Sequence, residues 1–281
     1  MKQRLFSIKT LNRCAASFLF LIMATTGAWA QNAANDKPSA VGPTGASSTD
    51  EKAEQIVKRA IEAMGGSNYL NARSIIGRGL FTQFKDGVSG LPTTFVDYLV
   101  YPDKERTEFK GGGVRVVQAN VGKTGWVFDG ATKSINDISA AQVADFQLAI
   151  RTNVDSLLRG AWRQEGAKLS YAGRREAGIA RRNETVKLTY PDGLVIEFEF
   201  GARDGIPAKV LYKKKNAEGE EAQEEDHLAQ FLNVDGITTP FVIDHFRAGV
   251  QTSRINYQSV EYNRPVPETL FAKPANVKAL K

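Results

Sequence analysis

The stretch Val121–Ile138, VGKTGWVFDGATKSINDI, shows the pattern on which the fold assignment depends. Trp126 and Phe128 alternate with small or polar residues, and this two-residue period is typical of a β-strand. Asp129-Gly130 then signals a tight turn, and the short run Thr132–Ile138 follows it. The sequence therefore predicts a β-hairpin that carries a large aromatic face.

Runs with the same period continue on both sides of the hairpin, separated by short turns rich in glycine, proline and aspartate. Connections this short allow only antiparallel neighbours. The strands are expected at Ser74–Lys85, Thr93–Tyr101, Glu105–Lys110, Val114–Asn120, Lys123–Asp129, Thr132–Ile138, Lys168–Ala172, Glu184–Tyr190, Leu194–Phe200, Ala208–Lys215, Ala222–Leu232, Thr238–Ala248 and Gln251–Tyr262.

Two segments have the spacing of amphipathic helices. Ser48 and Glu51 form a predicted capping box, an apolar stripe follows to Met64, and Gly65-Gly66 ends the helix. The second segment begins at Ser139 and ends at Gly160, and Asn153 is a candidate break within it. The order of elements is helix, six strands, helical segment and about seven strands, which excludes the alternating pattern of a parallel sheet. A sheet of ~13 strands must curl or close, and the two helical stripes are available to cover its concave face.

The first 30 residues are predicted to be a signal peptide cleaved after Ala30. Four cations precede the apolar run Cys14–Met23, and that run is too short to favour the alternative of a membrane anchor. The position of Cys14 before this run also disfavours a lipoprotein cysteine. Residues 31–47 have little to bury and are predicted to be a disordered tether, and residues 48–281 a single domain. We therefore expect a periplasmic protein.

Export changes the meaning of charge and cysteine content. Four of the 37 basic residues lie in the signal segment, and without them 33 basic residues face 31 acidic ones. This near balance argues against nucleic acid as a partner. The only cysteine, Cys14, would leave with the signal, so we expect no disulfide and a fold that depends on its hydrophobic core.

The sequence offers little for catalysis. His245 is adjacent to Asp244, but neighbouring strand residues point to opposite faces and cannot pair directly. No spacing of His, Asp and Glu suggests a metal site, and Gly111–Gly113 joins two strands rather than opening a phosphate-binding helix. We therefore predict a protein that is not an enzyme and needs no cofactor or metal. The basic pairs Arg174-Arg175 and Arg181-Arg182 are better explained as a solvated edge than as a lipid-headgroup site.

Apolar residues on strand and helix faces are the candidate ligand-binding residues. They suit either a cavity that takes an acyl chain or an ordinary packed core, and composition does not separate the two. The candidates for a hydrophobic cavity are Trp126, Phe128, Phe146, Ile150, Ile196, Phe198, Phe200 and Tyr212.

Several dispersed features resemble the LolA/LolB-like superfamily of exported lipoprotein carriers and the related LppX-type lipid-binding proteins. They are the helix end Glu62-Ala63-Met64-Gly65-Gly66, Gly79, Tyr101-Pro102 with Arg106, the run Gly122–Gly130, and Leu270-Phe271 with Pro274. The resemblance extends from about Glu51 to the C-terminus. It implies an unclosed antiparallel β-barrel of the α+β class, with the N-terminal helix and the central helical segment on its concave side. It also implies an interior that takes acyl chains.

The sequence departs from the LolA pattern at two positions. LolA proteins commonly have an arginine directly before the proline of the strand turn, where this chain has Tyr101, and an aromatic residue where it has Glu105. The resemblance therefore implies a relative with a different lipid or partner. We expect a monomeric carrier for an amphipathic lipid or lipoprotein, working with membrane-associated proteins. The alternative is an envelope assembly scaffold with a filled core and no ligand.

Overall fold

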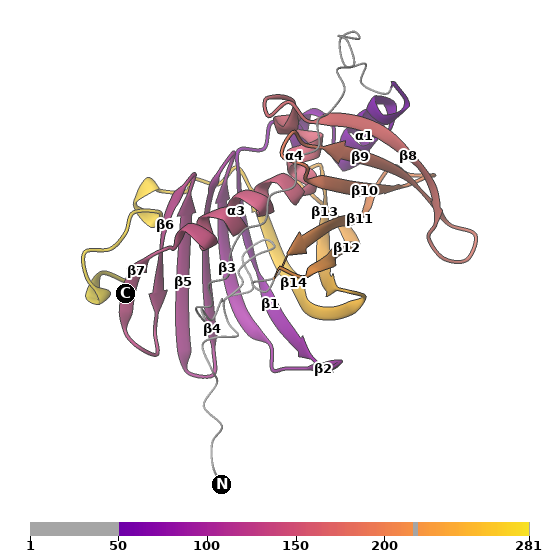
Figure 1. Ribbon diagram of the computed structural model, residues 1–281. Coiled ribbons are helices and arrows are strands. Elements are labelled where there is room, and N and C mark those ends of the chain that lie inside the picture. The colour runs from indigo at the N-terminus through magenta and orange to yellow at the C-terminus, as the bar shows by residue number, and fades with distance from the viewer. Residues whose placement is uncertain (1–50, 216–218, 281) are drawn as a thin grey trace, which may run out of the picture.

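The computed structural model describes residues 51–215 and 219–280 (Figure 1). The predicted signal peptide, the tether and the Ser48 cap lie outside these residues. Within them the fold is one large antiparallel sheet with a few short helices, as the strand pattern predicted. The sheet order is β7-β6-β5-β4-β3-β1-β14-β13-β12-β11-β10-β9-β8, and β2 pairs with β1 beside this path. Since β7 and β8 end the order without pairing to each other, the barrel is unclosed.

The sheet consists of two meanders joined by its first and last strands. β1 pairs with β14, so the first half-sheet (β1–β7) meets the second half-sheet (β8–β14) along this seam, and Figure 1 shows the second half-sheet turning across the first. The first half-sheet comprises β1 (Ser74–Lys85), β2 (Val88–Ser89), β3 (Thr93–Val100), β4 (Lys104–Gly111), β5 (Val114–Val121), β6 (Thr124–Asp129) and β7 (Ser134–Asp137). The second comprises β8 (Lys168–Glu176), β9 (Arg182–Thr189), β10 (Val195–Gly201), β11 (Pro207–Lys215), β12 (Glu221–Val234), β13 (Ile237–Arg247) and β14 (Val250–Tyr262).

The seam contains a β-bulge that explains one glycine. The β1–β14 register shifts between Arg78 and Gly79, and a Cβ at Gly79 would overlap the backbone carbonyl of Asn256. A bulge bends its strand and increases the local twist, which helps the sheet to curl at this point. Gly79 is therefore required by the close approach of two backbones.

In the described part of the chain four α-helices accompany the sheet: α1 (Glu51–Met64), α2 (Ser67–Leu70), α3 (Ala140–Thr152) and α4 (Val154–Leu158). Ser139 caps α3 in a reciprocal capping box with Gln142, with distances of 3.3 Å and 2.8 Å. Asn153 ends α3 and caps α4 through its side-chain oxygen, 2.8 Å from the amide nitrogen of Asp155. The predicted break at Asn153 is therefore confirmed. No described helix has the length and apolar character needed to cross a membrane.

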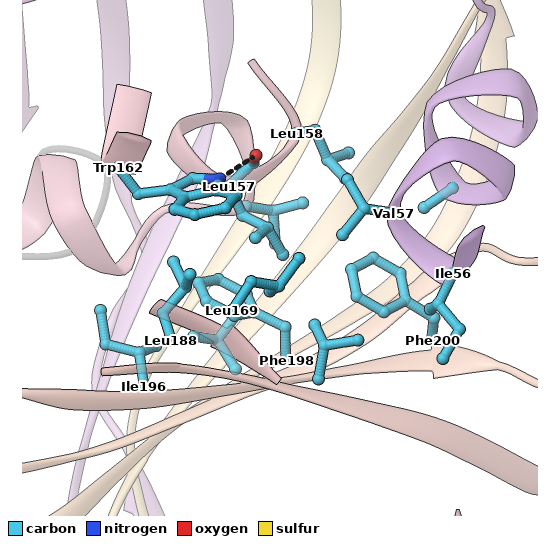
Figure 2. Close-up of a cluster of buried hydrophobic side chains, with 14 of the residues drawn as sticks. Ile56, Val57, Leu157, Leu158, Trp162, Leu169, Leu188, Ile196, Phe198 and Phe200 are labelled. Carbon is cyan, nitrogen blue, oxygen red and sulfur yellow. Dashed lines mark hydrogen bonds between the residues drawn. The ribbon is translucent and has the colours of Figure 1, made fainter. Parts of the chain in front are cut away.

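The largest hydrophobic core lies between α1, α4 and the second half-sheet (Figure 2). Ile56 and Val57 from α1 and Leu157 from α4 face strand residues such as Phe198 and Phe200, and Leu157 and both phenylalanines are fully buried. The Trp162 indole N–H, from the 3-10 helix Ala161–Arg163, donates to the Leu157 carbonyl at 3.1 Å. This core fastens α1 and α4 to the concave face.

The C-terminal segment, residues 265–280, covers the outer face of the first half-sheet and includes the 3-10 helices Glu268–Leu270 and Val277–Leu280. Arg106 on β4 donates to the Leu270 carbonyl at 2.7 Å, and the Trp126 indole N–H on β6 donates to the Phe271 carbonyl at 2.8 Å. The C-terminal segment therefore packs on the outer face at β4–β6, on the side of the half-sheet opposite α3. Figure 1 shows the segment, in yellow, beside β6.

Candidate functional site

Two small cavities lie where α3 and α4 cross the concave face. One has a volume of about 140 Å³ and lies between α3 and the β3–β4 hairpin, with Leu99, Glu105, Phe146, Ala149 and Ile150 in its lining. The other has a volume of about 130 Å³ and lies over the seam strands, with Asp97, Val260 and Tyr262 in its lining. Leu99, Tyr101, Asn153 and Asp155 line both cavities. We refer to the two together as the helix cavities.

A polar cluster stands where the helix cavities meet. The hydroxyls of Tyr69 and Tyr101 both donate to the Asp155 carboxylate, one to each oxygen. The Arg159 guanidinium lies 3.8 Å from the Tyr101 ring centroid and 5.0 Å from that of Tyr69. It also donates to the carbonyls of Tyr69, Leu70 and Ala72 at 2.8 Å, 3.0 Å and 3.0 Å. The cluster thus fixes α4 to α2 and to the β3–β4 turn. Burial, and then the nearby Asp155, raise the pKa of both tyrosines well above the usual range.

The floor of the helix cavities carries two buried carboxyl groups. Asp97 on β3 pairs with Thr107 on β4, and Glu105 lies two residues along β4 on the same face. Burial raises the pKa of Asp97 to about 6, although hydrogen bonds from the Thr107 hydroxyl, at 2.7 Å, and the Tyr98 amide oppose this. Burial also raises the pKa of Glu105 well above its usual range, and repulsion from Asp97 raises it further. Both groups therefore favour the protonated state more than an ordinary carboxyl does.

The raised pKa of Asp97 predicts an unusual stability profile. Its folded pKa, about 6, exceeds its ordinary value, 3.8, so between these pH values the folded state holds a proton that the unfolded chain has released. The stability from this group is present below pH 4 and is lost as the pH rises through 6. Asp97→Asn resembles the protonated form, and we expect it to raise the free energy of unfolding at pH 7.5 by about 1–3 kcal/mol.

Urea unfolding at pH 5 and pH 7.5 checks this expectation, with the exposed Glu62→Gln on α1 as a control. We expect the wild-type protein and the control to lose stability between the two pH values more steeply than Asp97→Asn. An Asp97→Asn variant that is less stable than wild type at pH 7.5 would contradict the assignment.

The structure divides the eight residues predicted for the cavity into three groups. Phe146 and Ile150 line one of the helix cavities. Ile196, Phe198, Phe200 and Tyr212 belong to the packed core beneath α1 and α4. Trp126 and Phe128 point to the outer face, where they pack with Leu280 of the C-terminal segment. This placement differs from the expected one beneath the helices. The strand β6 forms as predicted, but its aromatic side chains lie on the outer face of the sheet and not on the concave face.

The histidines make a pair that adjacency in the sequence does not reveal. His245 on β13 pairs across the sheet with Asp226 on β12, and its Nδ1 contacts the Asp226 carboxylate. Burial lowers the pKa of His245, but Asp226 more than offsets this and raises it. Ser253 stands opposite His245 on β14, yet the His245 Nε2 atom makes no hydrogen bond within the described residues. Since all three side chains are largely buried and none lines a helix cavity, we interpret the pair as structural. The described residues also contain no group of three or more possible metal ligands.

The basic pairs noted in the sequence contribute to a separate, open groove of about 890 Å³ at the far end of the second half-sheet. Arg174, Arg181, Arg182 and Arg203 all line it. Arg174 is paired with Glu184, and Arg182 with Glu176 at 3.0 Å. Because two of the four arginines already have acidic partners and the groove is open to solvent, we place the candidate site in the helix cavities.

The polar residues of the site were not predicted from the sequence to line a cavity, although two of them were noted there for another reason. Tyr101 and Glu105 were noted as departures from the LolA pattern, and both line the helix cavities. Asp97 and Asp155 had no such signal. A charged residue within an alternating strand is usually read as facing solvent, so the position of Asp97 on the concave face required the structure.

No protein-family model matches the sequence, and no curated protein matches it. Solved structures do match. A DUF1329 family protein from Desulfovibrio piger superposes with a TM-score of 0.56 at 12% identity, covering 80% of this chain and 98% of that one. An outer membrane lipoprotein-sorting protein domain from Vibrio parahaemolyticus gives 0.51 at 11% identity, covering 77% and 96%. A LolA superfamily protein from Nitrosomonas europaea gives 0.51 at 13% identity, covering 79% and 97%. The chain therefore has the LolA-like fold.

Proposed function

We propose that this chain is an exported, non-catalytic carrier for an amphipathic lipid or for the acyl chains of a lipoprotein. Residues 48–281 would act as one domain in the periplasm and bind the ligand between the concave face and α3–α4. The observation that carries the proposal is the pair of helix cavities in a LolA-like fold, with apolar walls from Leu99, Phe146 and Ile150. One structural neighbour is itself described as a lipoprotein-sorting protein. Each acyl methylene buried there would contribute about 0.8 kcal/mol.

The size of the cavities implies that α3 moves when a ligand enters. Each cavity is smaller than the ~300 Å³ at which small-molecule pockets usually begin. α3 is attached to both half-sheets by polar contacts of exposed or half-buried groups: Gln147 donates to the Gly122 carbonyl at 2.7 Å, and Asp145 pairs with Lys214 on β11 at 2.6 Å. Near the end of the helix, Arg151 pairs with Glu165 and Asp192, each at 2.5 Å. The non-helical Asn153 separates it from the firmly packed α4. In this proposal α3 is a lid and Asn153 is its hinge.

Filling the cavity tests the proposal. Ala149 is buried on α3 and lines the cavity next to Glu105, so Ala149→Trp would place an indole in the space intended for the ligand. We expect it to weaken binding of an uncharged fluorescent monoacylglycerol at least tenfold, a change of about 1.4 kcal/mol. Ala144→Trp, on the exposed side of the same helix, is the matched control and should bind as wild type does.

Native mass spectrometry of the protein purified from its exporting host provides an independent measurement. Co-purifying lipid that Ala149→Trp loses and Ala144→Trp retains would support the carrier function. If neither a lipid adduct nor saturable binding of the probe is seen with the wild-type protein, the carrier function is rejected. The alternative, an assembly scaffold with a filled core, would then be preferred.

A further inference from the structure

The two carboxyl groups on the cavity floor are close to each other, and the two cations that line the cavity beside Glu105 are engaged elsewhere. Lys104 pairs with Glu268 at 2.7 Å, and Arg159 donates to three backbone carbonyls. Asp97 and Glu105 are diagonal neighbours on paired strands, on the same face, and only 6% and 4% exposed. Diagonal neighbours in a sheet lie ~7–8 Å apart at Cα, within reach of a shared ligand group. Among the residues that the structure describes, no lysine, arginine or histidine forms an ion pair with either carboxyl.

The hydrogen bonds around this pair are also incomplete. The Asp97 carboxyl accepts from the Thr107 hydroxyl at 2.7 Å, but the Oε1 atom of Glu105 is buried and has no hydrogen-bond partner in the described structure. A buried acceptor left unpaired is unfavourable, and more so when the group is charged. Glu105 lines one helix cavity and Asp97 the other, with Leu99 lining both. The unsatisfied group is therefore placed where a ligand would lie.

The chemistry of the missing partner follows from these two observations. A purely apolar chain would leave the Glu105 Oε1 atom without a donor, and a fatty-acid carboxylate would bring a negative charge and no donor to the two acidic groups. A protonated amine supplies positive charge and up to three N–H donors to carboxylate oxygens. The neighbouring side chains Phe146 and Ile150 are apolar and suit the chain that follows such a head group.

We propose, on the basis of the carrier function above, that Asp97 and Glu105 bind the cationic amine head of the transported amphiphile, with its chain beneath α3. The site thereby selects amine-bearing amphiphiles over anionic ones of the same chain length. Asp97 and Glu105 are the specificity-determining residues of the carrier.

Three ligands that differ only in the head group test this selectivity. Dodecylamine, dodecanoic acid and dodecanol are titrated below their aggregation concentrations into the full mature protein at pH 7.5. We expect wild type to bind dodecylamine at least tenfold more tightly than dodecanoic acid, with dodecanol between them. In Asp97→Asn/Glu105→Gln the difference between amine and acid should shrink to less than threefold. Glu51→Gln/Glu62→Gln, which removes two exposed carboxylates from α1, should keep the wild-type preference.

The possible outcomes distinguish failure of the amine selectivity from failure of the carrier function. Saturable binding of all three ligands with equal affinities for amine and acid in wild type would overturn the selectivity and leave the carrier function standing. A preference that persists in Asp97→Asn/Glu105→Gln would overturn the assignment of these two residues. If none of the three ligands, including uncharged dodecanol, binds saturably, both the carrier function and the inference are rejected.

Discussion

Trp126→Ala is expected to lower the free energy of unfolding by about 3–5 kcal/mol while leaving ligand binding beneath α3 unchanged. Trp126 is 2% exposed and packs against Val117, Ala119 and Leu280, so truncation removes a large buried ring and leaves a cavity. It also removes the indole N–H that donates to the Phe271 carbonyl, which is then left without this partner. Urea unfolding measures the loss of stability, and titration with the monoacylglycerol probe measures binding on the folded fraction.

Trp126→Phe separates the two contributions of the indole. It keeps most of the apolar ring but loses the N–H donor, so its cost should be about 1–2 kcal/mol, well below that of the alanine variant. Glu105 and Arg106 are neighbours on β4 and must point to opposite faces, and Arg106 lies on the same side as the C-terminal segment. A folded Trp126→Ala protein with weakened ligand binding would therefore show that the two faces communicate, contrary to our interpretation.

The sheet was predictable from the sequence because most strands show the two-residue alternation and are bounded by recognisable turn residues. Nearly every strand begins and ends within two residues of its expected position, and the capping residue Ser139 and the break at Asn153 were found from local chemistry alone. The two-residue strand Val88–Ser89 was missed because it is too short to show a period. Local patterns suffice for these elements because turns and caps depend on residues close in the chain.

The sequence did not show which side chains of each strand point to the concave face, and this uncertainty affected the prediction of the site most. Trp126 and Phe128 were expected beneath the helices. The apolar pattern of β6 predicts that these side chains are buried, but it does not show whether the helices or another segment buries them. The C-terminal segment, more than 130 residues later in the chain, covers the outer face through Phe271 and Leu280. A shift of one residue in the register of a strand moves every side chain to the opposite face of the sheet. Likewise Asp97 shares its strand face with Phe95 and Leu99, and the strand pattern alone gave no sign that a carboxyl would be buried there.

The departures from the LolA pattern gain a physical meaning when their positions are considered together. Tyr101 donates to Asp155 in the cluster that positions α4, and Glu105 supplies a buried carboxyl to the cavity floor. An aromatic residue at position 105 would make that part of the floor apolar. Both positions line the same helix cavity, where a tyrosine hydroxyl stands in place of a guanidinium and a carboxyl in place of an aromatic ring. This is the region expected to contact the head group of a ligand.

Asp155→Ala is expected to lower the free energy of unfolding by about 2–5 kcal/mol, because it leaves the hydroxyls of Tyr69 and Tyr101 without their acceptor. The loss should also loosen α4, since Asp155 is the residue through which both tyrosines hold this helix. Urea unfolding measures the stability, and hydrogen exchange at the backbone amides of Ser156–Leu158 measures the loosening.

A triple variant determines whether the cost comes from unpaired hydroxyls or from the position of α4 itself. In Tyr69→Phe/Tyr101→Phe/Asp155→Ala the donors and the acceptor are removed together, and replacing both partners of a hydrogen bond by apolar groups is often nearly neutral. Arg159 keeps its three carbonyl acceptors in this variant. We therefore expect the triple variant to recover at least half of the stability lost in Asp155→Ala. Equal instability of the two variants would instead show that Asp155 stabilises α4 through its charge toward Arg159, and the tyrosine hydroxyls would then have no essential part in holding the helix over the cavity.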